Sequence, residues 1–468
     1  MTQASPVDPQ PPPPQTQKHA PGPTNKRLTT QAMEEDPLTF LLEMTQRYGD
    51  VVRLPLTFGT TYLINHPDGV RYVLQEHAAN YGKEPHENAI FKRFVGLSVL
   101  TAEGDFWLRL RRLEQPAFGR QHVAQACGQM VEAIRAYLDE WLPAGGSGEV
   151  IDMVPAMKAL ALRVLGKTIF SLDLSNEASA IGSAMQAINA SALDLFYHPF
   201  LPYFGPLAAS NRRRAAAQRV LDAVVFKLIH ERRAQLTNQR SYPEDSLTYL
   251  LQLRDEAGKP AFTDSQIRNE TLSLLIAGHD NASSLLCWTW YLLAQHPNAA
   301  ARLYQEIAET VGDRLPSFSD LDRLPYTRMV LEEALRLYPP AWSFPRRVIS
   351  DDVIGGYSIP AGSTVLLSPY TTHRHAAFWR DPEVFDPERF SEAEQAARPR
   401  YAHFPFGGGQ HQCMGAIYAM IEAQFIVIML AQRYRLECLP GFKPFPEPLV
   451  TLRPRALPMR VWKAHSSS

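Results

Sequence analysis

The segment FPFGGGQHQCMG, residues 404–415, holds one cysteine behind three consecutive glycines and just ahead of a long apolar stretch. Glycines beside a cysteine let the backbone approach the sulfur, or a group bound to it, more closely than other residues allow. We expect the N–H groups of residues 407–409 to face the sulfur of Cys413, together with the positive end of a helix that begins near Gly415. These features favour a thiolate, so the segment indicates that Cys413 is a metal ligand.

The surroundings of this cysteine narrow the choice of metal. One strong ligand is too few for a four-ligand zinc site, which favours a metal that carries its own equatorial ligands, as iron does in haem. His411 is expected to point away from that metal. The four cysteines, at positions 127, 287, 413 and 438, form no C-x-x-C pair and predict neither a disulfide framework nor a zinc ribbon. For this loop alone, a buried inert cysteine in a glycine-rich turn is the competing interpretation.

A second group of polar residues lies within a long helical pattern. The capping box of Thr263 and Gln266 starts this helix and Pro297 ends it, which gives about 30 residues or ~45 Å. Charged and amide side chains interrupt the pattern too often for a membrane span, so we expect a buried central helix. Helical spacing places Leu274, Ala277, Asn281 and Leu285 on one face, with Asp280 turned about 100° away.

The remaining elements must position these two segments. Residues 1–30 are rich in proline and poor in large apolar side chains, and predict a disordered tail. Residues 31–468 then read as one domain that is mainly α with a minor β-rich region. Helices are expected at 37–49 and 324–338, strands at 51–56 and 60–65, short β-rich runs at 351–370, and a deeply buried apolar helix at 416–434.

Composition excludes several classes of protein. The hydrophobic fraction is 45%, the charged fraction is 20%, and the net charge is -1. Such a balance is ordinary for a globular protein and gives no electrostatic case for nucleic acid. The N-terminus lacks the apolar core of a signal peptide or membrane anchor. We therefore expect a soluble protein of the cytoplasm, without a membrane anchor.

Three motifs in the same order resemble the cytochrome P-450 superfamily. The loop pattern is matched by Phe406, Gly409, Cys413 and Gly415, a Glu-x-x-Arg helix by Glu333 and Arg336, and the downstream Pro-Glu-Arg-Phe by residues 387–390. The resemblance covers the chain from about residue 36 onward. It implies a single haem b domain with a long central helix over the haem and the cysteine loop below it. It also implies a structural charge cluster of Glu333, Arg336 and Arg389.

The same resemblance assigns further site residues. Around the haem it implies cofactor contacts from Trp107, Arg111, Arg346, Phe406, Gly407, His411 and Gly415. Among these, Trp107, Arg111, Arg346 and His411 match the propionate positions. On the oxygen side it implies roles for Ala277, Gly278, Asp280 and Asn281. Asn281 departs from the pattern, because the family usually has threonine there. An amide can still donate a hydrogen bond or hold a water, whereas the usual delivery of protons comes into question.

The activity implied is insertion of one oxygen atom of O2 into an apolar small molecule, by hydroxylation or epoxidation. No dinucleotide fingerprint or cluster-type cysteine set is present, so electrons should come from a separate ferredoxin or flavodoxin with its reductase. An acidic donor is expected near Arg109, Arg112 and His411. Expected pocket walls are Phe94, Leu97, Leu274, Ala277, Trp342, Phe344 and the stretch 196–204. The alternatives are a haem-thiolate peroxygenase, a non-hydroxylating oxidase or isomerase, and a haem-based gas sensor.

Overall fold

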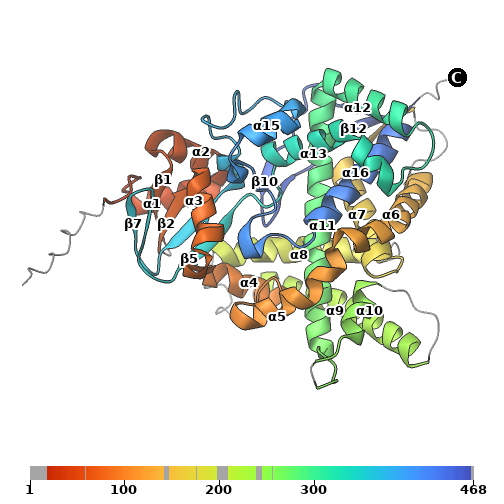
Figure 1. The fold of residues 1–468 in the computed structure, drawn as a ribbon, viewed down its shortest axis with the longest axis horizontal. Coiled ribbons are helices and arrows are strands. Elements are labelled where there is room, and N and C mark those ends of the chain that lie inside the picture. The colour runs from red at the N-terminus through yellow and green to blue at the C-terminus, as the bar shows by residue number, and fades with distance from the viewer. Residues whose placement is uncertain are drawn as a thin grey trace, which may run out of the picture.

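The computed structural model describes residues 18–57, 59–141, 147–174, 177–197, 209–238, 245–255 and 257–464. The architecture is mainly helical, with a small β-rich region beside the N-terminal helices (Figure 1). The longer helices are α1 (Lys26–Glu35), α2 (Pro37–Tyr48), α4 (Pro85–Val95), α5 (Gly104–Glu114), α6 (Arg120–Trp141), α7 (Met153–Ile169), α8 (Ala178–Tyr197), α9 (Ala209–Thr237), α11 (Asp264–Gln295), α12 (Pro297–Thr310), α13 (Pro325–Leu337) and α16 (Ala416–Arg433). Shorter ones are α3 (Pro67–Arg71), α10 (Ser246–Gln252), α14 (Pro369–Thr372), α15 (Glu392–Ala397), η6 (Pro387–Phe390) and η8 (Gly409–His411).

Helix α11 crosses the whole molecule, with α7, α9, α13 and α16 packed against it (Figure 1). The predicted capping box is present, because Gln266 N–H donates to the Thr263 hydroxyl while Thr263 N–H donates to the Gln266 side chain. The helix is 32 residues long and ends at Gln295, with His296 as its C-cap and Pro297 next in the chain. Most of its side chains are buried, so the expectation of a central buried helix is confirmed.

The β-rich region consists of small sheets. The largest has the strand order β1 (Val51–Leu56), β2 (Gly59–Ile64), β8 (Thr364–Leu367), β5 (Phe344–Val348) and β3 (Tyr81–Lys83). A second sheet joins β4 (Ser147–Asp152), β12 (Pro458–Lys463) and β9 (Tyr434–Cys438), and two hairpins pair β6 (Asp352–Ile354) with β7 (Tyr357–Ile359) and β10 (Pro446–Pro448) with β11 (Leu452–Pro454). The first sheet pairs β3 with β5, and both strands contribute residues to the cavity.

The N-terminal boundary of the domain lies earlier than predicted. Residues 1–17 lie outside the described part of the chain, but residues 18–30 pack against the sheet. Lys18 bridges Tyr357, Ala20 is buried, and Arg53 N–H donates to the Pro21 carbonyl over 2.8 Å. Helix α1 then begins at Lys26. Composition misjudged this segment because it is held by backbone hydrogen bonds, which a count of apolar side chains does not detect.

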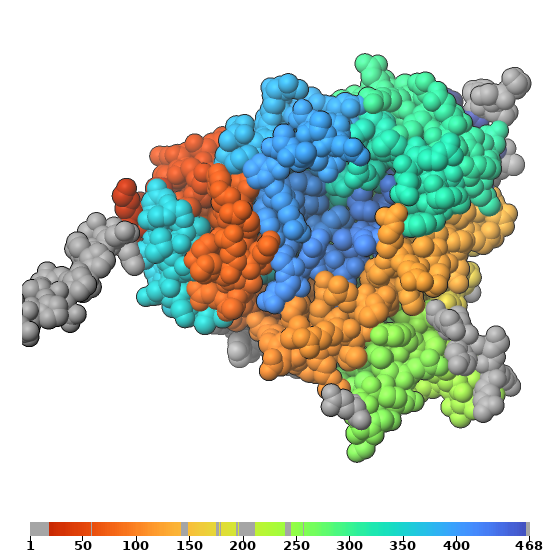
Figure 2. Space-filling model, in the orientation of Figure 1, coloured from red at the N-terminus to blue at the C-terminus, as the bar shows by residue number. Residues whose placement is uncertain are grey.

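Helix α16 follows the cysteine loop directly and is buried on nearly every face. Among the described helices it alone is long and apolar enough to cross a membrane, yet 67% of it is buried inside the protein. Its apolar surface is therefore core, as predicted. Figure 2 shows the blue C-terminal part of the chain at the centre of one face of the molecule, bordered by the orange segment that contains α5.

Candidate active site

A cavity of about 440 Å³ separates the cysteine loop from the middle of α11. Its walls come from α4, α5, α7, α11, β5 and the start of α16. Most of the lining is apolar, including Phe91, Leu100, Phe118, Leu165, Ile169, Leu274, Leu285, Leu335 and Phe344. Of the residues assigned by the sequence, the following also line it: Trp107, Arg111, Ala277, Gly278, Asn281, Arg346, Phe406, His411, Cys413 and Gly415.

The cysteine loop is shaped by its glycines, though not in the way expected. Gly407 and Gly409 have φ of 69° and 63°, and a Cβ on Gly409 would lie 1.8 Å from the Leu74 carbonyl oxygen. Gly407 N–H donates to the Phe404 carbonyl and Gly409 N–H to the Tyr401 hydroxyl. The prediction that these two N–H groups face the sulfur is therefore wrong. Their role is to make the turn.

The donor that reaches the sulfur is the N–H group of Gly415, which precedes α16. Cys413 is exposed, unlike the other three cysteines, because its side chain opens into the cavity. Burial within the loop raises the pKa of the Cys413 thiol, and the Gly415 N–H and the charge of Arg111 oppose that rise. A bound metal cation would add to the factors that favour the thiolate.

Unpaired cations surround the same end of the cavity. Within the described residues, Lys83, Arg111 and Arg346 form no ion pair with a carboxylate within 4.0 Å. His411 packs on Trp107 with ring centroids 4.0 Å apart, and burial together with these three charges lowers the pKa of His411 to about 4. Glu84, Glu87 and Glu422 also line the cavity. Burial raises the pKa of Glu87 to about 7 and that of Glu422 to about 8, which favours their neutral forms. The propionates of haem would supply the carboxylate partners that the three cations lack.

Helix α11 presents its predicted face to the cavity. Leu274, Ala277, Asn281 and Leu285 all line it. Gly278 also lines it, and a Cβ at that position would lie 2.8 Å from Leu165 Cδ1. The small residue at 278 is thus needed for the contact between α11 and α7.

Asp280 does not line the cavity. Its carboxylate is 3.0 Å from Lys158 Nζ, accepts from Asn189 Nδ2 over 2.6 Å, and lies 3.3 Å from His279 Nδ1. Burial acts to raise the pKa of Asp280, but the His279 hydrogen bond and the Lys158 charge outweigh it and hold the pKa below its ordinary value. The acid faces α7 and α8 because it lies about 100° around the helix from the cavity face.

Three of the predicted pocket residues lie elsewhere. Phe94, on α4, is buried in the hydrophobic core, and Leu97 is 45% exposed. Trp342 packs in a separate hydrophobic cluster and donates from Nε1 to the Leu449 carbonyl. Their residue types and their positions near the motifs suggested a pocket wall, but the sequence could not determine which way each side chain faces. The side chains of the expected wall at 196–204 lie outside the described residues.

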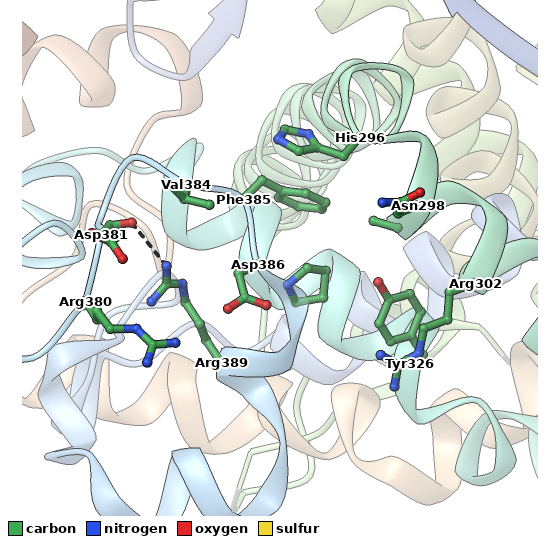
Figure 3. A pocket seen from close by; sticks show the side chains of 12 residues that line it. His296, Asn298, Arg302, Tyr326, Arg380, Asp381, Val384, Phe385, Asp386 and Arg389 are labelled. Carbon is green, nitrogen blue, oxygen red and sulfur yellow. Dashed lines mark hydrogen bonds between the residues drawn. The ribbon is translucent and has the colours of Figure 1, made fainter.

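The charge cluster is fully buried. Arg336 donates to both carboxylate oxygens of Glu333 over 2.7 Å and to carbonyl oxygens of residues 373, 382 and 384. Arg389 Nε lies 3.5 Å from Glu333. A separate hollow of about 510 Å³ adjoins this cluster, where Arg302 lies over the ring of Tyr326 and Arg389 donates to the Asp381 carbonyl (Figure 3). It shares no lining residue with the cavity at Cys413.

Sequence reasoning missed a carboxyl pair behind the cavity wall. Glu114 of α5 and Glu270 of α11 are 2% and 0% exposed. Glu270 accepts from Val99 N–H with both oxygens over 3.0 and 3.1 Å, whereas neither oxygen of Glu114 has a hydrogen-bond partner. Burial and the neighbouring Glu270 raise the pKa of Glu114, which favours a proton retained by the pair. Spacing did give a signal, since Glu114 is three residues beyond Arg111 on the same helix.

The comparisons with known proteins agree with this geometry. The family described as Cytochrome P450 matches residues 15–457. The chain belongs to the cytochrome P450 family. A crystal structure of the haem domain of cytochrome P450DA superposes with a TM-score of 0.86 at 23% identity, covering 97% of this chain and 99% of that one. The predicted fold is thereby confirmed, and the family identifies the protein as a haem-dependent monooxygenase.

Two of the relatives are bacterial cytochromes P450 of similar length. The chain is 33% identical to cyclooctatin synthase of Streptomyces melanosporofaciens over 425 residues, which are 90% of this chain and 90% of that protein. It is 31% identical to pentalenene oxygenase of Streptomyces avermitilis over 434 residues, which are 92% of this chain and 93% of that protein. A further relative from Streptomyces melanosporofaciens, cyclooctat-9-en-7-ol 5-monooxygenase, is 32% identical over 432 residues.

The residues present fit a haem. A single soft sulfur faces a large cavity, cations without a carboxylate partner lie at one edge, and a helix with small residues lies opposite the sulfur. No group of three or more His, Cys, Asp or Glu that could hold a metal ion occurs in the described part of the chain. The metal must therefore bring most of its own ligands, as haem iron does.

Proposed function

We propose that this cytochrome P450 inserts one oxygen atom of O2 into an apolar cyclic hydrocarbon, such as a terpene. The observation that carries the proposal is the apolar cavity between Cys413 and the Leu274–Leu285 face of α11, because an apolar substrate gains binding energy only from such a wall. The names of the relatives support the substrate class, since cyclooctat-9-en-7-ol and pentalenene are both named as alkenes.

The chain would hold haem b through Cys413, whose sulfur would bind the iron. Arg111, Arg346 and His411 would bind the propionates, with Lys83 as a further cation at the same edge. Phe406 and Gly415 would contact the haem from the cysteine side, and Gly407 would shape the loop. When bound, haem supplies the iron that, with two electrons, activates O2.

The apolar walls would exclude water from the reacting carbon and hold it near the iron. Asn281, which lines the cavity at Ala277, would donate a hydrogen bond on the oxygen side. Asp280 pairs with Lys158 and accepts from Asn189. It would therefore act on the cavity face by holding α11 in place, without contacting a ligand.

Electrons would come from a separate ferredoxin or flavodoxin. Arg109 and Arg112 are exposed on α5, the helix that also carries the cavity residues Trp107 and Arg111. An acidic donor docked there would lie on the cysteine side of the haem. Replacing both arginines with glutamate should slow reduction by an acidic ferredoxin without changing the spectrum of the loaded protein. An unchanged reduction rate would count against this docking site.

The substrate class is tested by optical titration of the ferric protein. A cyclic diterpene hydrocarbon should shift the Soret band to the high-spin position, and a linear fatty acid should bind more weakly. Leu274→Glu, which puts a charge into the wall, should abolish the shift without loss of haem. Tighter binding of the fatty acid would overturn the proposed class.

A peroxide-driven reaction is the second candidate, because Asp280 is held away from the cavity. The comparison that decides is turnover with a ferredoxin and its reductase against turnover with hydrogen peroxide alone. The monooxygenase predicts product in the first assay and little in the second.

A further inference from the structure

The carboxamide of Asn281 is held at both ends. Its Nδ2 donates to the Ala277 carbonyl over 2.8 Å, and its Oδ1 accepts from the Thr451 hydroxyl over 3.2 Å. A carbonyl oxygen can only accept, so the amide nitrogen must face Ala277. The amide oxygen is therefore left for Thr451, whose hydroxyl must donate. The reversed amide would place two acceptors against each other.

Thr451 lies where its own position is firmly fixed. It is 5% exposed and directly precedes β11. The next residue, Leu452, accepts from Ser284 Oγ and, over 3.2 Å, from Trp288 Nε1, and its N–H donates to the Pro340 carbonyl over 2.9 Å. Positions 281, 284 and 288 follow each other at helical spacing, so the strand is tied along one face of α11. Thr451 thus keeps its place without help from a ligand.

An amide at this position can do what one hydroxyl cannot. A threonine has a single proton, and donating it to the carbonyl four residues back leaves none for the cavity. The carboxamide nitrogen has two protons. One is taken by Ala277, and Asn281 lines the cavity, so the second is available there. The hydrogen bond from Thr451 to the amide oxygen adds to the Ala277 contact and further stabilises the orientation that exposes this proton.

We propose that Thr451 is a positioning residue for oxygen insertion, which holds the Asn281 carboxamide with its N–H side toward the haem cavity. The inference rests on the proposed function. Thr451 does not line the cavity and would act only through Asn281.

The test compares Thr451→Val with Thr451→Ser in the haem-loaded protein. The first measurement is the C–O stretching band of carbon monoxide bound to the reduced protein, which responds to a donor on the distal side. We expect one narrow band in the parent and in T451S, and a broadened or split band in T451V. The second measurement is the ratio of product formed to electrons consumed. We expect this ratio to fall about fivefold in T451V, the factor that corresponds to the loss of one hydrogen bond of typical net strength.

Ser284→Ala is the matched control, because it removes another tie of the same strand without touching Asn281. It should leave both measurements as in the parent. Thr451→Ala should give the same two results as T451V, and it replaces T451V in the test if the valine variant does not fold. T451V and T451A that match the parent, or S284A that matches T451V, would overturn the inference. A reduced CO complex without the thiolate Soret band would overturn the proposed function itself, whereas that band with silent variants at 451 would overturn only the inference.

Discussion

Replacing Glu114 with glutamine should change how the stability of the protein depends on pH. Burial raises the pKa of Glu114 far above its ordinary value of 4.5, and the neighbouring Glu270 raises it further, while Arg111 opposes the shift. Burial also raises the pKa of Glu270 to about 7, against the Val99 N–H and the charge of Lys83. The native protein thus keeps a proton that the unfolded chain releases.

The sign of the effect follows from this difference in proton binding. Because the pKa of Glu114 is higher in the native protein than in the unfolded chain, the stabilisation is complete below the unfolded-chain pKa. It is lost as the pH rises toward the native pKa. Each pH unit in that window costs about 1.4 kcal/mol, so the loss from about pH 5.5 to 8.5 is at most about 4 kcal/mol. For 468 residues, 1 kcal/mol corresponds to about 1 °C in Tm, which gives about 4 °C.

The assay is thermal unfolding of the haem-loaded protein at both pH values, followed by circular dichroism. The amide of E114Q donates to Glu270 at every pH, so its Tm should exceed that of the parent by up to about 4 °C more at the higher pH. Asp105→Asn, at an exposed site in the first turn of the same helix, is the control and should shift Tm equally at both values. If Tm changes by the same amount between the two pH values in E114Q and in the parent, the pair does not retain a proton.

Three further outcomes follow from the site. Gly409→Ala should prevent haem incorporation, because a Cβ there would clash with the neighbouring backbone. Gly441→Ala, also at positive φ but with open space around it, should lower the free energy of unfolding by only about 1 kcal/mol. Soret absorbance per mole of protein measures haem incorporation in both variants. Arg346→Ala should speed haem loss about tenfold or more, while Arg347→Ala on the exposed side of the same strand should not; transfer of haem to apomyoglobin gives the rates. Arg336→Lys should destabilise folding by about 3 to 5 kcal/mol, seen in urea unfolding, and an unaltered midpoint would contradict the buried cluster.

The sequence predicted those parts of the site in which local chemistry determines geometry. The capping box at Thr263 and the proline at 297 set the limits of α11, and helical spacing then placed Leu274, Ala277 and Asn281 on the cavity face. Residue types alone in the motif around Cys413 pointed to a loop that the structure places at the cavity. These features depend on neighbours within a few residues along the chain.

The errors concern interactions between distant segments. The N–H groups of Gly407 and Gly409 were expected at the sulfur but are taken by Phe404 and Tyr401. Nothing in the spacing around Asp280 shows that Lys158 and Asn189 lie beside it.

The carboxyl pair and the Thr451 contact could not be predicted for the same reason. Glu114 lies on α5 and Glu270 on α11, and only the folded chain brings them together. Thr451 reaches Asn281 from a strand near the C-terminal end of the chain. Such contacts leave no periodic pattern in the sequence.

The claim on which the proposed function depends is that the sulfur of Cys413 would bind a haem iron. The most direct test is the absorption spectrum of the reduced protein with carbon monoxide bound. The account predicts a Soret band at the long-wavelength position typical of thiolate ligation, lost or moved to shorter wavelength in Cys413→His. A band at the position typical of histidine ligation in the unaltered protein, or no bound haem at all, would contradict it.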